Sequence, residues 1–263
     1  MQDLNGRTAI ITGSATGLGR SIALKLAERG ASVIINYSKS KKEAEQTLAD
    51  CNALGSQAIL VQGDVSTEAG AKALADAAAP WGKLDILVNN AGTTRHAADH
   101  SDLDALSKQD FLDIYAVNVA GPFLVMQACK PLLLKPFEQF GRSAAVVNIS
   151  SIAGVRGSGS SVAYAASKGA FNTMTKSLGR ALGPAIRVNA VCPGYIGTRW
   201  FKDALTGEQL EKLEARVKAS VPLEAVSGPE DIADTAVLFC TDATRHVTGE
   251  TLLVDAGMHL GRQ

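Results

Sequence analysis

The sequence of 263 residues has little of what marks several protein classes. Its four cysteines are widely spaced and form neither a C-x-x-C pair nor a dense framework, which disfavours disulfides and structural zinc. No apolar run approaches the roughly 18 residues that a membrane-spanning helix needs. The first residues also lack the basic and apolar segments of a secretory signal. We therefore expect a cytoplasmic protein with no membrane partner.

Net charge is absent as well, because 26 Lys and Arg residues balance 26 Asp and Glu residues. The charge balance gives no electrostatic reason to expect nucleic acid as a partner. Hydrophobic residues make up 46% of the chain and charged residues 20%, which is ample for a large core. The sequence shows no internal repeat, low-complexity tract or interdomain linker, so we expect residues 1–263 to form a single domain.

What the sequence does contain is a regular alternation of apolar, β-branched segments with helical patterns. This alternation predicts an α/β fold of the Rossmann type, a doubly wound parallel sheet of about seven strands flanked by helices. Ligands of such sheets bind beyond the carboxyl ends of the strands. The expected strands are residues 7–12, 32–37, 57–62, 84–88, 144–149, 186–191 and 251–254.

The first strand runs into a glycine-rich turn before a helical pattern that lasts to about Arg29. Gly13 would allow a tight exit from the strand, while Gly17 and Gly19 would let backbone N–H groups at the helix start approach a diphosphate. The spacing is G-x-x-x-G-x-G and not the common G-x-G-x-x-G fingerprint. On its own, this turn fits a dinucleotide site and an ordinary glycine-rich turn about equally.

The second strand lacks the acidic residue that would bind the adenosine ribose of NAD. Ser40 has capping-box spacing for the next helix, which places Lys41 and Lys42 in its first turn. Cations there oppose the helix dipole by a few tenths to ~1 kcal/mol, so a compensating anion is expected. The 2′-phosphate of NADP would serve, with Ser38 and Lys39 closest. The sequence thus favours NADP(H), with NAD(H) possible, and a solvated basic patch is the alternative.

Small polar residues follow the third and fourth strands. Asp64 can accept a hydrogen bond from an adenine amino group, or it can act as a helix cap or turn residue. Asn90 and Gly92 would let the backbone pass close to a cofactor, although an ordinary loop also fits. His96 and His100 come next, without a register that would fix metal geometry. We expect a solvated loop over the cleft at this point and no metal site.

Tyr164 and Lys168 stand four residues apart among small residues that suit a helix, so their side chains would share one face. A lone phenol titrates near ~10 and is a poor base at neutral pH, but an adjacent cation lowers that pKa. Lys168 could thus tune Tyr164 as a general acid/base. Ser151 follows the fifth strand, and no histidine is placed to make it a nucleophile. An isolated Y-x-x-x-K would instead suit an ordinary surface helix.

Two further segments are expected to shape the site. A long helix over residues 108–134 carries Asn118 in its interior, where this weak helix former marks either a local irregularity or an exposed face. Residues 199–221 form a polar, helical-looking segment that is predicted to close over the substrate as a lid.

Together these motifs resemble the short-chain dehydrogenase/reductase family in its classical form, nearest in general likeness to the 3-oxoacyl-acyl-carrier-protein reductases. The likeness covers nearly the whole chain, and the order and separation of the motifs make it specific. It implies hydride transfer between a nicotinamide cofactor and a carbonyl carbon. The motifs that carry it are residues 12–19, Asp64, residues 89–92, Asn118, Ser151, Tyr164, Lys168 and residues 193–198.

The resemblance also implies a role for each residue. Tyr164 would be the acid/base, Lys168 would lower its pKa and hold the nicotinamide ribose, and Ser151 would orient the substrate oxygen. Asn118 would hold a water of a proton relay through its backbone. A homotetramer is implied, with helices 108–134 and 162–182 between subunits. The implied cofactor contacts are Gly13, Ser14, Thr16, Gly17, Leu18, Gly19, Tyr37, Ser38, Lys39, Asp64, Val65, Asn90, Ala91, Gly92, Tyr164, Lys168, Pro193, Gly194, Ile196 and Thr198.

The sequence therefore predicts an NADPH-dependent ketone or 3-oxoacyl reductase with a small carbonyl or alcohol substrate. An NAD-dependent sugar, polyol or steroid alcohol dehydrogenase is the alternative within the same class. A cofactor-binding sensor without turnover would have lost part of the catalytic set, whereas all four residues are present. Residues 93–117 and 133–142 look longer than in compact family members, which leaves the substrate open.

Overall fold

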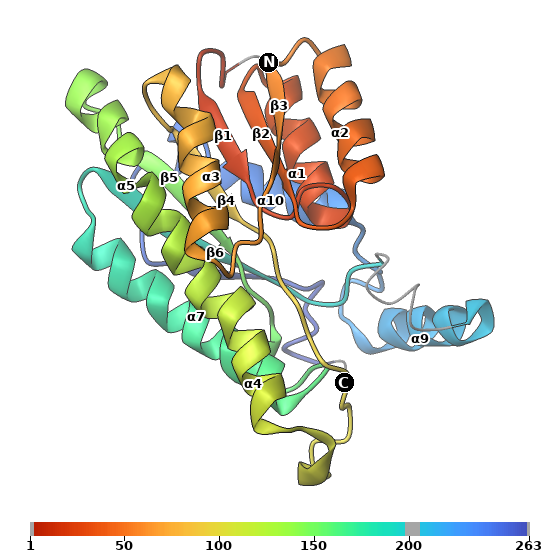
Figure 1. Ribbon diagram of the computed structural model, residues 1–263. Coiled ribbons are helices and arrows are strands. Elements are labelled where there is room, and N and C mark those ends of the chain that lie inside the picture. The colour runs from red at the N-terminus through yellow and green to blue at the C-terminus, as the bar shows by residue number, and fades with distance from the viewer. Residues whose placement is uncertain (1–2, 198–205, 262–263) are drawn as a thin grey trace.

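The computed structural model describes residues 3–197 and 206–261, which form a layered α/β structure (Figure 1). Its strands make one seven-stranded sheet in the order β3-β2-β1-β4-β5-β6-β7, and every neighbouring pair is parallel. The predicted fold class is confirmed, with strand ends that differ from the prediction by one or two residues. The strands are β1 Thr8–Ile11, β2 Ser32–Tyr37, β3 Ala58–Gln62, β4 Ile86–Asn89, β5 Ala144–Ile149, β6 Ile186–Pro193 and β7 Thr251–Val254.

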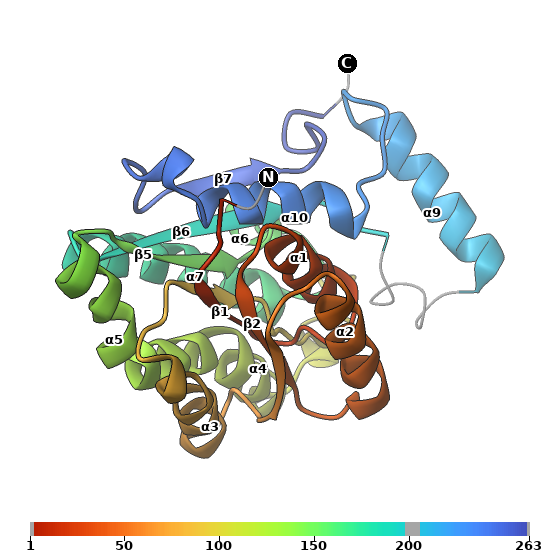
Figure 2. The same ribbon diagram turned by 90° about the horizontal axis from the view of Figure 1, so that it is seen from above.

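Helices cover both faces of the sheet. The helices α1, α2 and α10 pack on one face, and α3, α5 and α7 pack on the other (Figure 2). The α-helices are α1 Gly17–Glu28, α2 Lys41–Ala53, α3 Glu68–Ala78, α4 Lys108–Tyr115, α5 Gly121–Phe140, α6 Ala153–Arg156, α7 Val162–Ala181, α9 Gly207–Ser220 and α10 Pro229–Phe239. Shorter turns are η1 Ala79–Trp81, η2 Leu103–Ala105, the π-helical η3 Ala116–Ala120 and η4 Asp242–Thr244.

The sheet is apolar on both faces because both are covered. Successive residues of a strand point to opposite sides, so Ile10 and Ile34 pack into the layer of α3 and α5, while Ile11 and Ile35 pack into the layer of α1 and α10. All four side chains are fully buried. This two-sided burial explains why the strands read as continuous apolar runs and not as alternating ones.

The long helix expected over residues 108–134 is interrupted and longer than predicted. The chain runs from α4 through the π-helical turn η3 into α5, and α5 ends only at Phe140. Most of residues 133–142 therefore belong to α5, so the segment that looked longer than in compact family members is largely helical. The irregularity expected at Asn118 is the π-helical turn itself.

The continuous helical stretch Lys108–Phe140 is also more apolar than the sequence analysis allowed. Its 33 residues include an 18-residue window of mean hydropathy 1.3, enough to cross a membrane by length and composition alone. The expectation that no segment approaches this criterion was wrong. The side chains of Val125, Met126 and Cys129 are buried against the sheet and α3, so this stretch is a core helix.

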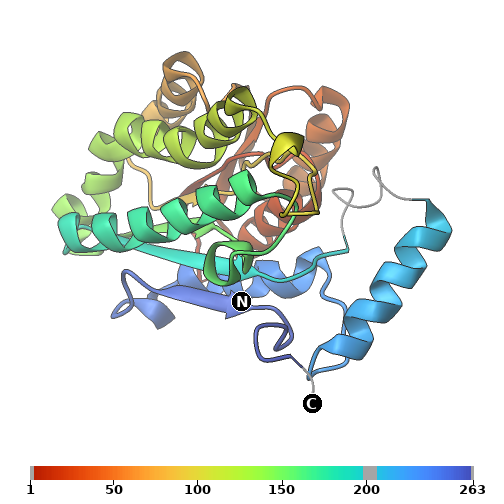
Figure 3. The same ribbon diagram turned by 90° about the horizontal axis from the view of Figure 1, so that it is seen from below.

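The chain order places a crevice at the carboxyl ends of β1 and β4. The connections that leave β1 and β4 pass to opposite faces of the sheet, so the loops after these strands part at that edge. On the same side of the sheet, α9 projects from the body of the molecule (Figure 3). None of the side chains of α9 is fully buried.

Candidate active site

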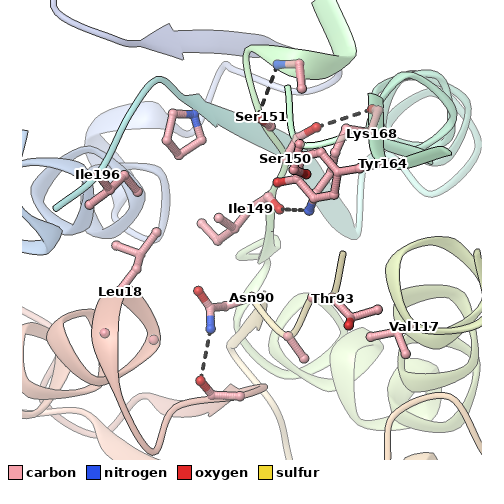
Figure 4. A pocket seen from close by; sticks show the side chains of 18 of the residues that line it. Leu18, Asn90, Thr93, Val117, Ile149, Ser150, Ser151, Tyr164, Lys168 and Ile196 are labelled. Carbon is pink, nitrogen blue, oxygen red and sulfur yellow. Dashed lines mark hydrogen bonds between the residues drawn. The ribbon is translucent and has the colours of Figure 1, made fainter. Parts of the chain in front are cut away.

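A cleft of about 850 Å³ opens at the carboxyl ends of the strands. Figure 4 shows Ser151, Tyr164 and Lys168 gathered on one side of it, with Leu18 and Asn90 across from them. Ser14, Tyr37 and Asn118 do not line the cleft, and Thr198 lies outside the described residues. The predicted site residues that line the cleft are Gly13, Thr16, Gly17, Leu18, Gly19, Ser38, Lys39, Asp64, Val65, Asn90, Ala91, Gly92, Ser151, Tyr164, Lys168, Pro193, Gly194 and Ile196.

The glycine turn has the geometry that a diphosphate site requires. Gly13 and Gly17 have φ of +61° and +56°, in the left-handed region that favours glycine. A Cβ added to Gly19 would lie 2.6 Å from the carbonyl oxygen of Gly13 and would also overlap the Asn90 amide, so only glycine fits there. The first turn of α1 carries no acidic residue, and its N-cap Thr16 makes no side-chain cap. The amino end of α1 therefore suits a phosphate group.

Asn36 supports this turn, and the sequence analysis missed it. Its Oδ1 accepts a hydrogen bond of 3.0 Å from the Gly13 N–H, and its Nδ2 donates to the carbonyl oxygen of Gly63 at 3.0 Å. Ser14 is buried beneath the same turn and supports it, because its hydroxyl donates a hydrogen bond of 2.7 Å to the carbonyl oxygen of Ile11. Asn36 lies near the end of β2, and the sequence analysis looked there only for an acidic residue. The signal that it overlooked was an amide side chain in an otherwise apolar strand, which is buried in the structure.

A second brace joins β1 to β4 at the same edge. The amide of Asn90 donates to the carbonyl oxygens of Thr12 and Gly13 at 3.0 and 3.1 Å. In return, the Thr12 hydroxyl accepts from the N–H groups of Asn90 and Ala91 at 2.9 and 3.0 Å. Asn90 is thus a structural support of the glycine turn as well as part of the cleft lining.

The basic stretch after β2 divides into two parts. Ser38 and Lys39 line the cleft, as expected for contacts to a 2′-phosphate. Ser40 is the N-cap of α2 but makes no side-chain cap, so the cap expected from Ser40 is not formed. Lys41 pairs with Glu45 at 3.8 Å and is largely exposed, which gives that lysine an anion within its own helix. Lys39 therefore carries the case for an anion in the cleft.

Asp64 is engaged in its own turn. Its Oδ1 accepts from the Ser66 N–H at 3.0 Å and from the Ser66 hydroxyl at 2.7 Å. These hydrogen bonds, with a small contribution from Lys39, hold the pKa of the Asp64 carboxyl below its usual value. The turn role, one of the two that the sequence left open, is present, and Asp64 also lines the cleft.

The predicted catalytic pair lies at the start of α7. The hydroxyl of the N-cap Ser161 accepts from the Tyr164 N–H at 3.1 Å, which fixes where the helix begins. Lys168 stands one turn on, with its Nζ 5.7 Å from the centroid of the Tyr164 ring. Its ammonium donates to the carbonyl oxygen of Ile149 at 2.8 Å (Figure 4). The Ser151 hydroxyl is hydrogen-bonded to the Tyr164 phenol. The i, i+4 spacing therefore gives the shared face that the sequence predicted.

Burial dominates the electrostatics of this pair. Burial raises the pKa of Tyr164 to about 12, although the hydrogen bond from Ser151 opposes the shift. Burial lowers the pKa of Lys168 to about 8. The pKa of the phenol is therefore not lowered in this structure, contrary to the expectation for Lys168, because desolvation of the phenolate dominates. At neutral pH the pair consists of a phenol and an ammonium, which is its proton-donating form.

Asn118 supports the pair from behind. Its Oδ1 accepts from the Thr93 N–H at 2.8 Å, and its Nδ2 donates to Thr93 O at 3.0 Å and to the Ser167 hydroxyl at 3.1 Å. The Ser167 hydroxyl in turn donates to the carbonyl oxygen of Tyr164 at 2.7 Å. Asn118 thus joins the loop after β4 to the helix that carries the phenol.

The loop with the two histidines lies over the cleft, as expected. His96 lines the cleft, while Nε2 of His100 donates to the carbonyl oxygen of Gly159 at 3.3 Å. The Ala97 N–H donates to Ser160 O at 2.8 Å, which pins this loop to the segment before α7. Within residues 3–197 and 206–261, no three His, Cys, Asp or Glu side chains gather in a way that could hold a metal ion.

The segment predicted as a lid is described from residue 206 onward. There it forms α9 and the turn that follows, and α9 stands out from the cleft side of the molecule (Figure 3). The Tyr195 hydroxyl, at the cleft, donates to Glu214 of α9 at 3.4 Å. Burial, together with the Glu214 carboxylate, raises the pKa of Tyr195 to about 12. One face of α9, with Leu210, Leu213 and Val217, is partly covered.

Comparison with known proteins agrees with this geometry. A family model described as enoyl-(acyl carrier protein) reductase matches residues 13–259. A Streptomyces violaceoruber protein, named as ketoacyl reductase 2 of the granaticin polyketide synthase, is 41% identical over 253 residues, 96% of each chain. The 3-oxoacyl-[acyl-carrier-protein] reductase FabG of Staphylococcus aureus is 35% identical over 256 residues, 97% of this chain and 98% of the relative.

Two solved structures carry cofactors. The Pseudomonas aeruginosa RhlG/NADP active-site complex superposes with a TM-score of 0.87 at 32% identity and covers 98% of each chain. The 7α-hydroxysteroid dehydrogenase complexed with NADH and 7-oxo glycochenodeoxycholic acid superposes with a TM-score of 0.86 at 32% identity, covering 97% of this chain and 95% of the other. Relatives of this chain thus bind NADP in one case and NADH in another.

Proposed function

The chain belongs to the classical short-chain dehydrogenase/reductase family, enzymes that act on CH–OH and C=O groups, and we propose that it is an NADPH-dependent ketone or 3-oxoacyl reductase. The observation that carries the proposal is the convergence of Ser151, Tyr164 and Lys168 at one end of a cleft whose other end is the glycine turn. A cofactor with its diphosphate at that turn and its nicotinamide at the three side chains would span the cleft.

The side chains divide the chemistry between them. A nicotinamide held at these side chains would supply the hydride for the new C–H bond. Tyr164 donates its phenolic proton to the carbonyl oxygen, so that an O–H bond forms and the products are an alcohol and oxidised cofactor. Ser151 donates a hydrogen bond to the same oxygen and orients it. Lys168, held by Ile149 O, keeps a positive charge beside the phenol.

The residues present fit a nicotinamide dinucleotide. The left-handed Gly13 and Gly17 and the uncapped amino end of α1 provide the diphosphate site. The preference for NADPH is supported by Lys39 in the cleft lining. It is also supported by the RhlG relative, which was solved with NADP.

We further propose that residues 1–263 act as one cytoplasmic domain and assemble as a homotetramer. Leu112 on α4 and Phe123 on α5 leave 52% and 46% of their surfaces exposed, and a second subunit would cover these apolar side chains. These helices are the ones expected between subunits. Light scattering on the purified protein measures the assembly directly, and a monomer at micromolar concentration would contradict it.

The test of the function is a fluorescence titration with NADPH and NADH in parallel, followed by a panel of ketones scored at the nicotinamide absorbance band. We expect NADPH to bind at least ~10-fold tighter, about 1.4 kcal/mol, and ketones to be reduced. Equal or tighter binding of NADH would favour the second candidate, an NAD-dependent sugar, polyol or steroid alcohol dehydrogenase. That candidate is supported by the steroid dehydrogenase relative with NADH and by the internal Lys41–Glu45 pair.

A further inference from the structure

The substrate end of the cleft, beyond Ser151 and Tyr164, has one polar wall. The loop after β4 and the segment before α7 contribute it, with His96 as its largest polar side chain. The Ser160 hydroxyl of this wall shares a hydrogen bond of 2.6 Å with Thr94. Because one hydroxyl of this wall is already engaged by Thr94, the imidazole of His96 is the larger polar group that the wall offers to a ligand. The other polar side chains of the wall are Thr93, Ser158 and Ser160.

His96 is held on both sides. Two hydrogen bonds join Thr93 to the Asn118 amide, at 2.8 and 3.0 Å. On the other side, the Ala97 N–H donates to Ser160 O at 2.8 Å. Because the backbone is fixed before and after His96, little backbone entropy remains to be lost when its side chain binds a ligand.

The opposite wall is apolar. It consists of Ile152 and Ala153 at the start of α6 and of Met258 in the turn after β7. The buried carboxylate of Asp255 accepts from the N–H groups of Gly257 and His259 at 3.0 and 2.9 Å, which shapes that turn. The turn is also fastened to α6, because a guanidinium N–H of Arg156 donates to the carbonyl oxygen of Met258 at 2.9 Å. Met258 is therefore placed as firmly as His96.

The sheet order sets the two walls apart. Because β4 and β7 lie on either side of β5 and β6, the loops that carry His96 and Met258 flank Ser151, which follows β5. Both walls attach to one short segment, Met258 at Arg156 and the histidine loop at Ser160. The two anchoring residues are only four positions apart in the chain, so the two walls are tied to each other through this segment.

The reacting position lies between the walls. A Cβ built on Gly159, within that short segment, would be 3.6 Å from Cδ1 of Tyr164 and 3.0 Å from the Cβ of Ala153. A carbonyl group at the Tyr164 phenol therefore has an apolar surface on one side and a hydrogen-bonding surface on the other.

Resting on the proposed function, we propose that His96 and Met258 are specificity-determining residues that sort the two arms of an unsymmetrical ketone. His96 donates a hydrogen bond to an acyl oxygen two carbons from the reacting carbon, and Met258 packs on the alkyl arm. A 3-oxoacyl compound has both arms. A sugar is polar on both sides and would be mismatched at the apolar wall. A steroid ketone is largely apolar on both sides and would be mismatched at the polar wall. Each mismatch would lower kcat/KM relative to a 3-oxoacyl compound.

The experiment compares methyl 3-oxohexanoate with 4-octanone, whose chain has the same length but carries CH2 groups in place of the acyl carbonyl and the ester oxygen. In the wild type, kcat/KM is expected to be higher for the ester. His96→Ala should lower kcat/KM for the ester about 5- to 10-fold, as one lost hydrogen bond predicts, and change that for 4-octanone less than about twofold. His246→Ala, an exposed histidine outside the cleft lining, is the matched control.

Met258 is tested by chain length. Met258→Ala should lower kcat/KM for methyl 3-oxohexanoate relative to methyl acetoacetate by about 5-fold, since two buried methylenes lose their apolar contact. Leu260→Ala is the control, because Leu260 lies two residues on and is 74% exposed. An unchanged ratio in Met258→Ala would remove Met258 from the proposal.

Other outcomes separate the two proposals. If His96→Ala lowers kcat/KM equally for the ester and for 4-octanone, His96 only supports the structure of its loop. The inference then fails, while the reductase function stands. If the wild type reduces neither compound, the function fails, and calorimetric titration of both compounds into the NADP⁺ complex decides the inference. Tighter binding of the ester by the wild type but not by His96→Ala would then support it, and equal binding by the wild type would overturn it.

Discussion

The Lys168 ammonium donates a hydrogen bond of 2.8 Å to the carbonyl oxygen of Ile149, at the carboxyl end of β5. This bond holds a charge in an interior that disfavours it, since burial lowers the pKa of Lys168 to about 8. An ordinary lysine keeps its charge to about pH 10. In this site the ammonium is lost as pH rises through about 8, while the phenol of Tyr164 stays protonated up to about 12.

This difference predicts the pH dependence of the reaction. For ketone reduction, kcat/KM for NADPH should be constant below about pH 8 and fall above it, because that parameter reports the free enzyme. In Lys168→Arg the guanidinium remains charged at every accessible pH, so the alkaline fall should move up by more than about one pH unit even if the rate is lower. A wild-type profile that stays flat to pH 10 would contradict the assignment.

Tyr164→Phe separates chemistry from binding. The variant keeps the ring that packs beside Lys168 and removes only the hydroxyl that donates the proton. We expect kcat to fall at least about 10²-fold, the usual contribution of general acid catalysis, while the Kd for NADPH changes less than about threefold. A variant that retains most of the wild-type kcat would contradict the proposed role of Tyr164 as proton donor.

Asn36 is predicted to control cofactor affinity without touching the chemistry. Asn36→Ala removes the acceptor for the Gly13 N–H and leaves that group unpaired, at a cost of about 1–3 kcal/mol. Part of this cost should appear as a Kd for NADPH raised about 10-fold, with a smaller change in kcat at saturating cofactor. Fluorescence titration measures the first effect and steady-state rates the second. An unchanged Kd would mean that the turn keeps its shape without Asn36.

The layers of the fold and the residues at the centre of the site could be predicted from the sequence for physical reasons. Continuous apolar strands alternating with helical patterns allow few arrangements other than a covered parallel sheet. A serine just after β5 and a Y-x-x-x-K pair at the start of the long helix α7 had to meet at one edge. The strand ends and the helix face shared by Tyr164 and Lys168 could therefore be predicted from the sequence.

What stayed hidden depends on burial and on contacts far apart in the chain. The pKa of Tyr164 rises because the site is buried, and no residue spacing reveals burial. The polar wall exists because Thr94 meets Ser160, 66 residues away. The expected helix ended at Leu134, whereas α5 continues through Pro136 to Phe140.

Two neighbouring lysines provide a matched test of cofactor preference. Lys39 lines the cleft, whereas Lys41 is paired with Glu45 and lies outside the lining. Lys39→Ala should raise the Kd for NADPH about 10-fold, since one phosphate contact contributes about 1.5 kcal/mol, and leave the Kd for NADH unchanged. Lys41→Ala should change neither. An equal loss of NADPH affinity in Lys39→Ala and Lys41→Ala would mean that these lysines act only as a diffuse basic patch.

The last prediction concerns the link between the cleft and α9. Tyr195 lines the cleft and donates to Glu214 at 3.4 Å, so this hydrogen bond joins the cleft wall to a helix with no fully buried side chain. Few contacts hold α9, and removal of one should loosen it. Tyr195→Phe should therefore speed amide hydrogen exchange in residues 207–220 and raise KM for ketones about 3-fold, while kcat changes less, because a modest hydrogen bond contributes about 0.5–1.5 kcal/mol.

Glu214→Gln gives the matched comparison for this link. The amide keeps an oxygen that accepts from the Tyr195 hydroxyl, so exchange in α9 should stay close to that of the wild type. The pKa of Tyr195 should fall toward its ordinary value, because the carboxylate helps to raise it to about 12. Ultraviolet difference titration at 295 nm follows that phenol, with Tyr195→Phe as the blank. If both variants leave exchange and KM unchanged, α9 is held by its apolar face alone, and the Tyr195–Glu214 bond has no part in closing the cleft.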